Sequence, residues 1–132
     1  MGAILEAVTL CAGIVVGDRV CYDVALRPAR LADIYRATET VPVPEDLDNP
    51  RARVAYQMRI DDAVVLCQIE ALGELEGDEV PGPGVLAEQL EPDDMALLRG
   101  AAARVKKKLL QSRSKSLISG GQSASSSAAA SP

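Results

Sequence analysis

Apolar residues alternate with small or polar ones near the start of the chain, a pattern typical of a strand with one buried side. The dipeptide Gly17-Asp18 tolerates the positive φ values of a tight turn. The pattern predicts a β-hairpin with strands over 13–16 and 19–26, inside a β region at 4–26. The apolar residues of the second strand are expected on its packed side, and they are Val20, Tyr22, Val24 and Leu26.

The hydrophobic period changes to a helical one after these strands. Pro28 and Asp33 stand where a first helical turn favours them, and Leu31, Ile34 and Tyr35 follow at helical spacing. These features predict a helix over 29–39. The stretch TVPVPEDLDNP contains three prolines, so we expect it to be an extended acidic connection.

The longest helical pattern is predicted over 51–72, with Pro50 at its start and Gly73 as its stop. Apolar residues widen around this helix toward its C-terminal half, including Leu66 and Ile69, so we expect that half to be buried. A short turn of helix is expected at VLAEQL.

A last helix is predicted over 92–111, because Pro92 and two carboxylates open it at the positive end of the helix dipole. Its apolar residues are spaced three and four apart, which indicates a narrow seam for helix packing. The seam consists of Met95, Leu98, Ala102, Val105 and Leu109.

The fold class that follows is α+β: an N-terminal β-hairpin or small antiparallel sheet, then three to four helices. Residues 1–111 form one domain of this kind. Residues 112–132 are rich in Ser, Ala and Gly, and such a segment buries too little apolar surface to offset chain entropy. We therefore expect a disordered C-terminal tail.

The composition of the chain limits the kinds of catalytic and metal-binding sites that it can form. The chain has no His, Phe or Trp and only three Cys among 132 residues. Zinc-site spacing is absent, and a nucleophilic cysteine would lack its usual base, so we interpret Cys11, Cys21 and Cys67 as reduced packing residues. Asp61 and Asp62 are adjacent and point about 100° apart on a helix, which favours a solvated edge over paired acid–base catalysis. We expect no enzyme activity, metal or cofactor.

Charge is distributed unevenly around the net value of −5. All 19 acidic residues precede Met95, whereas six of the 14 basic residues follow Gly100. This basic segment can bind phosphates, so contact with nucleic acid is one interpretation. The favoured one is structural, because Lys106, Lys107 and Lys108 suit the C-terminal end of a helix and the acidic remainder offers them partners.

The N-terminal apolar run has no basic residue before it and is interrupted by Glu6, which argues against an export signal. No uncharged stretch has the length of a membrane-spanning helix. A soluble, cytoplasmic protein without membrane contact is the expectation.

Three short motifs resemble the tail assembly chaperones of tailed bacteriophages, of the Mu-like tail assembly protein type. The first is a strand end followed by a helix with an acid in its first turn, here Val24, Ala25, Leu26, Arg27, Pro28 and Asp33. The second, a helix with a glycine corner, is matched by Ile69, Ala71, Leu72 and Gly73. The third, a helix start, is matched by Leu90, Pro92, Asp93 and Leu97.

The resemblance covers about residues 4–106 and implies a nonvirion protein of the host cytoplasm that has no catalytic residues. Members of this family bind the long, helical tape measure protein and keep it soluble until tail tube subunits polymerise around it. The tape measure protein is thus the expected partner, with the tail tube protein as a second. The alternative function is a small regulatory or packaging protein that contacts nucleic acid through the basic C-terminal segment.

The residues expected to bind such a partner lie on the last helix and in the tail. The helical seam suits binding of a partner helix in a groove. Leu117 and Ile118 are the apolar pair that a tethered tail could present to it. The candidate partner-binding residues are Leu98, Val105, Leu109, Leu117 and Ile118.

Overall fold

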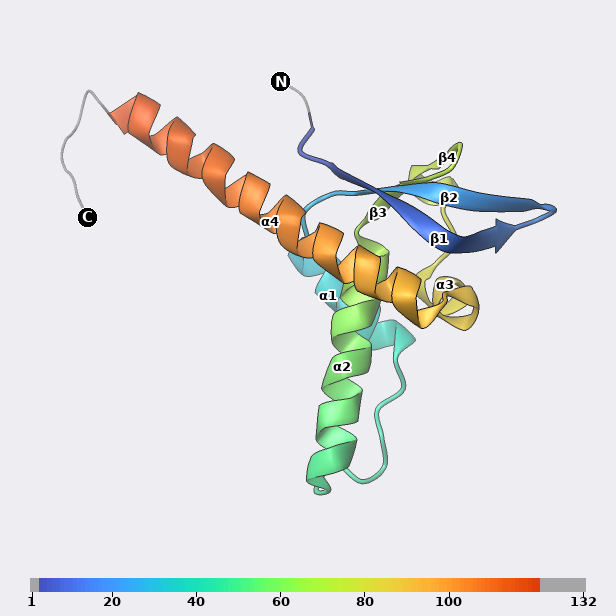
Figure 1. The fold of residues 1–132 in the computed structure, drawn as a ribbon. Coiled ribbons are helices and arrows are strands. Elements are labelled where there is room, and N and C mark those ends of the chain that lie inside the picture. The colour runs from blue at the N-terminus through green and yellow to red at the C-terminus, as the bar shows by residue number, and fades with distance from the viewer. Residues whose placement is uncertain (1–2, 122–132) are drawn as a thin grey trace.

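The computed structural model describes the backbone of residues 3–121 and the side chains of residues 3–115. A four-stranded antiparallel sheet has the order β1-β2-β3-β4, and four α-helices accompany it (Figure 1). The strands are β1 (Glu6–Val16), β2 (Arg19–Leu26), β3 (Ile69–Leu72) and β4 (Leu75–Glu76). The helices are α1 (Leu31–Thr40), α2 (Pro50–Cys67), α3 (Pro83–Gln89) and α4 (Pro92–Gly121), with a 3₁₀ turn η1 at Gly77–Glu79. The predicted α+β class is confirmed.

The hairpin forms as predicted, with Gly17 at φ 66° and Val16 paired with Arg19. Its strands are irregular further along, because Thr9 pairs with Asp23 and Ile14 with Cys21. Residues 10–13 of β1 therefore bulge opposite Tyr22. Such a bulge shifts which side chains face the core.

The predicted packed side of β2 is only half correct. Val24 and Leu26 are buried, but Val20 and Tyr22 are 46% and 45% exposed. Both exposed side chains lie over Gly13 of the bulge, where a Cβ would come within 2.7 Å of Val20 Cγ1 and 3.0 Å of Tyr22 Cε1. Cys21, between them, is buried instead, so the side of β2 that faces the core changes between Tyr22 and Val24.

The helix predicted over 51–72 is wrong at its end. Helix α2 stops at Cys67, and Ile69 to Leu72 form β3 on the free edge of β2. Strand pairing supplies that edge with hydrogen-bond partners, and Gly73 at φ 60° then turns the chain into β4. Leu66 and Ile69 are buried as expected, although Ile69 reaches the core from a strand.

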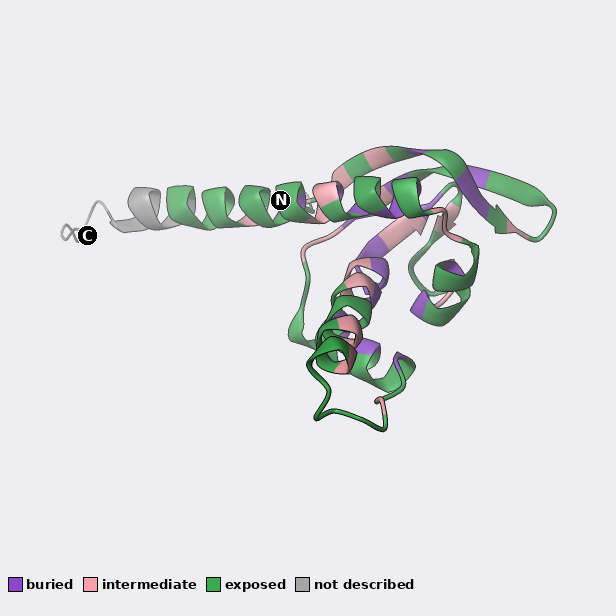
Figure 2. Cartoon of the chain, turned by 60° about the horizontal axis from the view of Figure 1, so that its bottom comes forward, coloured by how far each residue is buried: buried purple, intermediate pink, exposed green. Residues whose placement is uncertain are grey.

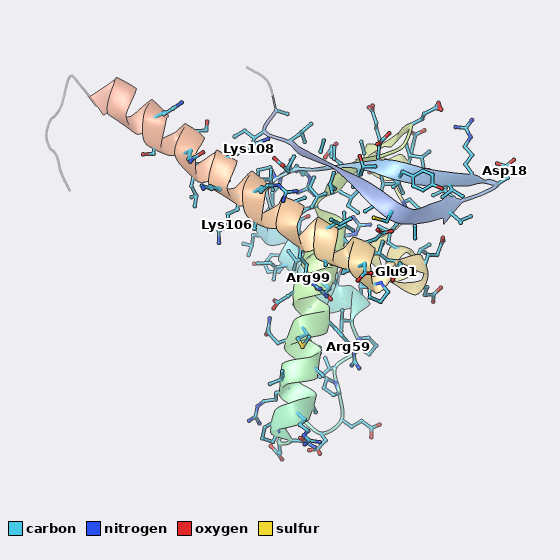
Figure 3. The ribbon with its side chains drawn as sticks, in the orientation of Figure 1. Asp18, Arg59, Glu91, Arg99, Lys106 and Lys108 are labelled. Atoms are coloured by element: carbon cyan, nitrogen blue, oxygen red, sulfur yellow. The ribbon has the colours of Figure 1, made fainter. Side chains whose placement is uncertain are left out.

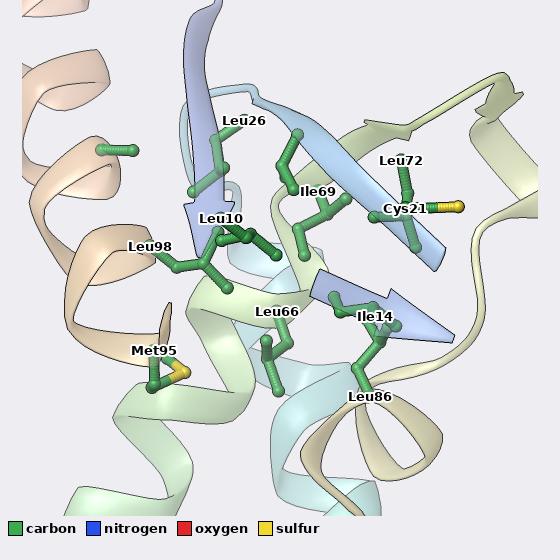
Figure 4. Close-up of a cluster of buried hydrophobic side chains, with 12 residues drawn as sticks. Leu10, Ile14, Cys21, Leu26, Leu66, Ile69, Leu72, Leu86, Met95 and Leu98 are labelled. Atoms are coloured by element: carbon green, nitrogen blue, oxygen red, sulfur yellow. The ribbon is translucent and has the colours of Figure 1, made fainter. Parts of the chain in front are cut away.

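The main core lies between the sheet, α4, α3 and the end of α2 (Figure 4). Strands β1 to β3 contribute Leu10, Ile14, Leu26 and Leu72, and α4 contributes Met95, Leu98 and Ala101. A smaller cluster of Ala37, Val41, Ile60 and Ala63 joins α1 to α2. This second cluster holds α1 against α2.

Helix α4 crosses the sheet beside β1 and then extends past the body of the molecule (Figures 1 and 2). It continues to Gly121, so the predicted helix end at residue 111 is wrong. Extending an existing helix costs far less than starting one, which explains why composition misplaced the boundary. Residues 122–132 lie outside the described part of the chain.

Candidate functional site

Titratable side chains singled out in the sequence are used structurally. Asp61 accepts a hydrogen bond from Gln57, whereas Asp62 holds Arg99 of α4 through two bonds of 2.8 Å. As predicted, the two carboxylates do not converge. Among the described residues, no group of three acidic, cysteine or histidine side chains could hold a metal ion.

The three cysteines are free and differ in their surroundings. Cys21 and Cys67 are buried as expected, and burial raises the pKa of the Cys67 thiol. Cys11 is exposed, so its prediction as a packing residue is wrong. It belongs to the bulge of β1, whose backbone turns that side chain away from the core.

Asp94 is the fully buried carboxylate of α4. The sequence pattern predicted its place in the first helical turn but not its burial. Asp94 accepts the backbone N–H groups of Cys11, Ala12 and Gly13 at 2.7, 2.9 and 3.0 Å. Burial raises the pKa of this carboxyl, but the three donors outweigh burial and hold the pKa below its ordinary value. The start of α4 is thereby fixed to the bulge.

The basic segment has two sides with different roles. Arg104 and Lys108 both bind Glu6 at 2.7 Å, and Lys108 also donates to the Leu5 carbonyl. Hydrogen bonds from Lys108 and Arg104 lower the pKa of Glu6. The acidic partner expected for this segment is found for Arg104 and Lys108, but α4 continues to Gly121, so the prediction that Lys106, Lys107 and Lys108 lie at the C-terminal end of the helix is wrong.

The five predicted partner-binding residues fall into three groups. Leu98 and Val105 are fully buried, so in this structure neither side chain is open to a partner. The seam that contains them completes the core. Leu109 is half-buried, whereas the side chains of Leu117 and Ile118 lie outside the described residues.

A shallow hollow of about 370 Å³ runs beside Leu109. We call it the α4 groove. One wall is the connection between β2 and α1, the other is the side of α4, and Gln68 lies at its base. Its lining residues are Pro28, Ala29, Gln68, Ala102, Ala103, Lys106, Leu109 and Leu110. Most of this lining is apolar, and Leu110 is 55% exposed.

Buried polar contacts hold the wall opposite α4. Arg27 binds both oxygens of Asp33 at 2.8 Å and donates to the carbonyls of Cys67 and Pro28. The side-chain amide of Gln68 donates to the Arg27 carbonyl at 2.9 Å, and the backbone carbonyl of Gln68 accepts a hydrogen bond from the Arg27 backbone N–H. These bonds fix the backbone on both sides of Pro28, so the α4 groove exists before any partner binds.

The ion pair at this wall keeps its charge. Burial raises the pKa of Asp33, but the Arg27 guanidinium and the Arg30 N–H outweigh burial, and the net pKa is lowered. The Asp33 hydrogen bonds raise the pKa of Arg27 in return. The role of both residues in this structure is to shape the chain between β2 and α1.

Helix α1 carries a second exposed apolar surface. The helical spacing of its apolar residues predicted the helix but not which side of it faces solvent. Leu31, Ile34 and Tyr35 are 61%, 43% and 59% exposed, whereas Asp33 and Ala37 are buried. The helix thus turns its larger apolar side to solvent. Leu31 follows Ala29 of the α4 groove by two residues along the chain.

A second hollow of about 260 Å³ lies between α1, α2 and α3. Its apolar lining includes Val41, Leu66 and Pro83, and Arg59 and Asp62 supply its charged groups. Asp62 is already bound to Arg99. Arg59, like Lys106 of the α4 groove, forms no ion pair among the described residues, so charge does not separate the two hollows. The α4 groove is the larger of the two, at about 370 Å³ against 260 Å³, and it is therefore the stronger candidate.

No helix among the described residues is long and apolar enough to cross a membrane. Comparison with protein-family models, curated proteins and solved structures gives no significant match for this chain.

Proposed function

We propose that this protein is a phage tail assembly chaperone that binds the tape measure protein and keeps it soluble during tail tube assembly. The observation that carries the proposal is the preformed α4 groove, an apolar surface that the described residues leave open. The sequence resemblance supplies the identity of the partner.

The groove suits a helical partner. Ala102 and Ala103 keep one end of the groove wall low, so a partner backbone can approach closely there. Leu109 and Leu110 offer larger apolar contacts further along the same helix. Recognition of an amphipathic helix in an apolar groove is a common mode of protein binding, and tape measure proteins are long helices in the family that this chain resembles.

A chaperone of this kind needs apolar surface that stays exposed without causing its own aggregation. The exposed side of α1 adds such surface next to the α4 groove, and apolar patches of this sort mark interaction sites on soluble proteins. The acidic residues of the body give the molecule a net charge of −5, which favours solubility.

Co-expression with the tape measure protein of the same genome tests the proposal. We expect the full chain to raise the soluble fraction of that protein and to copurify with it. Leu110→Asp should lose both effects because it places a charge in the α4 groove. Val85→Asp is the control, since Val85 is similarly exposed on α3, at 51% against 55%.

The alternative of nucleic-acid contact rests on four exposed cations that form no ion pair among the described residues: Lys106, Lys107, Arg113 and Lys115. Binding of this kind would weaken steeply with salt and would depend little on Leu110. DNA binding that persists in Leu110→Asp, without any effect on the tape measure protein, would favour the alternative.

A further inference from the structure

The side of α4 that faces the groove carries unpaired positive charge. Lys106 lines the groove, and Arg113 follows seven residues later, which returns to nearly the same side of a helix. Both side chains are exposed and form no ion pair among the described residues. In Figure 3 Lys106 and Lys108 leave α4 on opposite sides, and Lys108 is the one that binds Glu6.

The same side of α4 begins with a cation that is already neutralised. Arg99 precedes Lys106 by seven residues and is held by Asp62 through two hydrogen bonds. A carboxylate of α2 thus satisfies the first member of this row, while the described part of the chain supplies none for the second and third. The row alternates with the apolar residues Ala102, Ala103, Leu109 and Leu110.

From this arrangement we propose that the α4 groove binds an amphipathic helix whose contact side carries carboxylates seven residues apart, opposite Lys106 and Arg113. This inference rests on the proposed function and specifies which kind of helix the partner offers. The apolar residues of that helix pack on Leu109 and Leu110, and its two carboxylates take the place that Asp62 has for Arg99.

The spacing follows from helix geometry. Seven residues advance a helix by about 10.5 Å, so Lys106 and Arg113 present two charges at that separation. A partner helix packed lengthwise at a small crossing angle repeats its own contact side with nearly the same period. Carboxylates at that repeat therefore meet both cations at once, whereas irregularly placed ones meet one at most.

Charge reversal on one side of α4 tests this inference in the full chain. The variant is Lys106→Glu with Arg113→Glu. The matched control is Lys107→Glu with Lys115→Glu, which makes the same change in net charge at exposed residues on other sides of the helix. Circular dichroism verifies that both variants keep the fold of the parent.

The probes are two synthetic amphipathic helices of about three heptads. Both have the same leucine side, and they differ in having glutamates or lysines at two positions seven residues apart. We expect the glutamate peptide to bind the parent and the control alike, and to bind the groove variant about tenfold more weakly. The lysine peptide should prefer the groove variant.

Equal weakening in both variants would overturn the inference, because net charge alone would then explain binding. Failure of the parent to prefer the glutamate peptide would overturn it as well.

The tape measure protein separates this inference from the proposed function. If the groove variant still keeps that protein soluble, the charge pattern is wrong and the chaperone function stands. If the parent binds the glutamate peptide as expected but never affects the tape measure protein, the groove inference holds and the proposed function fails.

Discussion

At the scale of single residues, two buried carboxylates determine how this chain is arranged, and they act in different ways. Asp33 pairs with Arg27 and shapes the connection between β2 and α1. Asp94 has no cationic partner within the described residues and accepts hydrogen bonds from three backbone N–H groups instead. Those donors belong to the bulge of an edge strand, where unpaired N–H groups would otherwise invite another chain.

Asp94→Asn should lower the free energy of unfolding by about 2–4 kcal/mol, because hydrogen bonds to a charged acceptor contribute about 1.5–3 kcal/mol each. An asparagine offers one oxygen, so at least one N–H of the bulge would face an NH₂ group. Urea denaturation at neutral pH measures the change. Asp93→Asn is the control, since it removes an exposed carboxylate from the same helical turn. Equal effects of the two variants would contradict this role of Asp94.

The pH dependence of the parent protein gives the same variant a second readout. The pKa of Asp94 is lowered in the folded state, so its contribution to stability is present above the ordinary aspartate value and is lost as the pH falls through the folded value. The difference between parent and Asp94→Asn should therefore shrink when unfolding is measured at about pH 3 instead of neutral pH. A difference independent of pH would show that the carboxylate charge is not the cause.

At the scale of elements, the hydrophobic period predicted most of the strands and helices but not how they meet. The hairpin, α1, α3 and the start of α4 are found where local spacing and turn residues placed them. Strand β3 was missed because Ile69–Leu72 is apolar enough for either element, and the free edge of β2 decides between them. Tertiary pairing of this kind leaves no local signal.

The candidate site was predictable only in part, because it too depends on contacts between residues that are far apart along the chain. The sequence identified α4 and Leu109, but it assigned the seam to a partner when the seam completes the core. The wall at Pro28 and Ala29 was not anticipated, because it depends on Arg27, whose partners include Cys67, forty residues away along the chain. Contacts over such separations are set by packing and are not encoded in spacing.

The bulge of β1 is the element whose geometry is most sensitive to substitution. A positive φ by itself costs a residue other than glycine about 1–2 kcal/mol. Gly13→Ala should lower the free energy of unfolding by more than this, because the added Cβ would lie 2.7 Å from Val20 Cγ1 and 3.0 Å from the Cys21 carbonyl oxygen. Gly17→Ala is the control, with a positive φ but no atom within 4 Å of the added Cβ. Thermal unfolding compares the two, and a smaller loss for Gly13→Ala would show that the bulge relaxes easily.

At the scale of the whole molecule, charge and burial divide α4 along its length. Its first part closes the core and is held by Asp94, Asp62 and Glu6. Beyond Leu110 the described side chains are exposed, and the helix leaves the body (Figure 2). The same helix thus completes an acidic domain at one end and presents positive charge to solvent at the other.

This division predicts that residues 112–132 are dispensable for folding. Their deletion should leave the melting temperature unchanged, because the last ion pair from α4 to the body among the described residues is made by Lys108. Deletion of 101–132 is the contrasting variant and should prevent folding, since it removes the buried Ala101 and Val105. A lower melting temperature for the shorter deletion would contradict the prediction.

The shorter deletion should nevertheless weaken binding of the glutamate peptide, because it removes Arg113 while Lys106 remains. A third chain that ends at Lys115 keeps Arg113 and lacks Leu117 and Ile118. If this chain keeps the tape measure protein as soluble as the full chain does, the two apolar residues have no part in recognition, and the α4 groove with its two cations is sufficient. If solubility falls to the level of the shorter deletion, those residues contribute the contact that the sequence predicted for them.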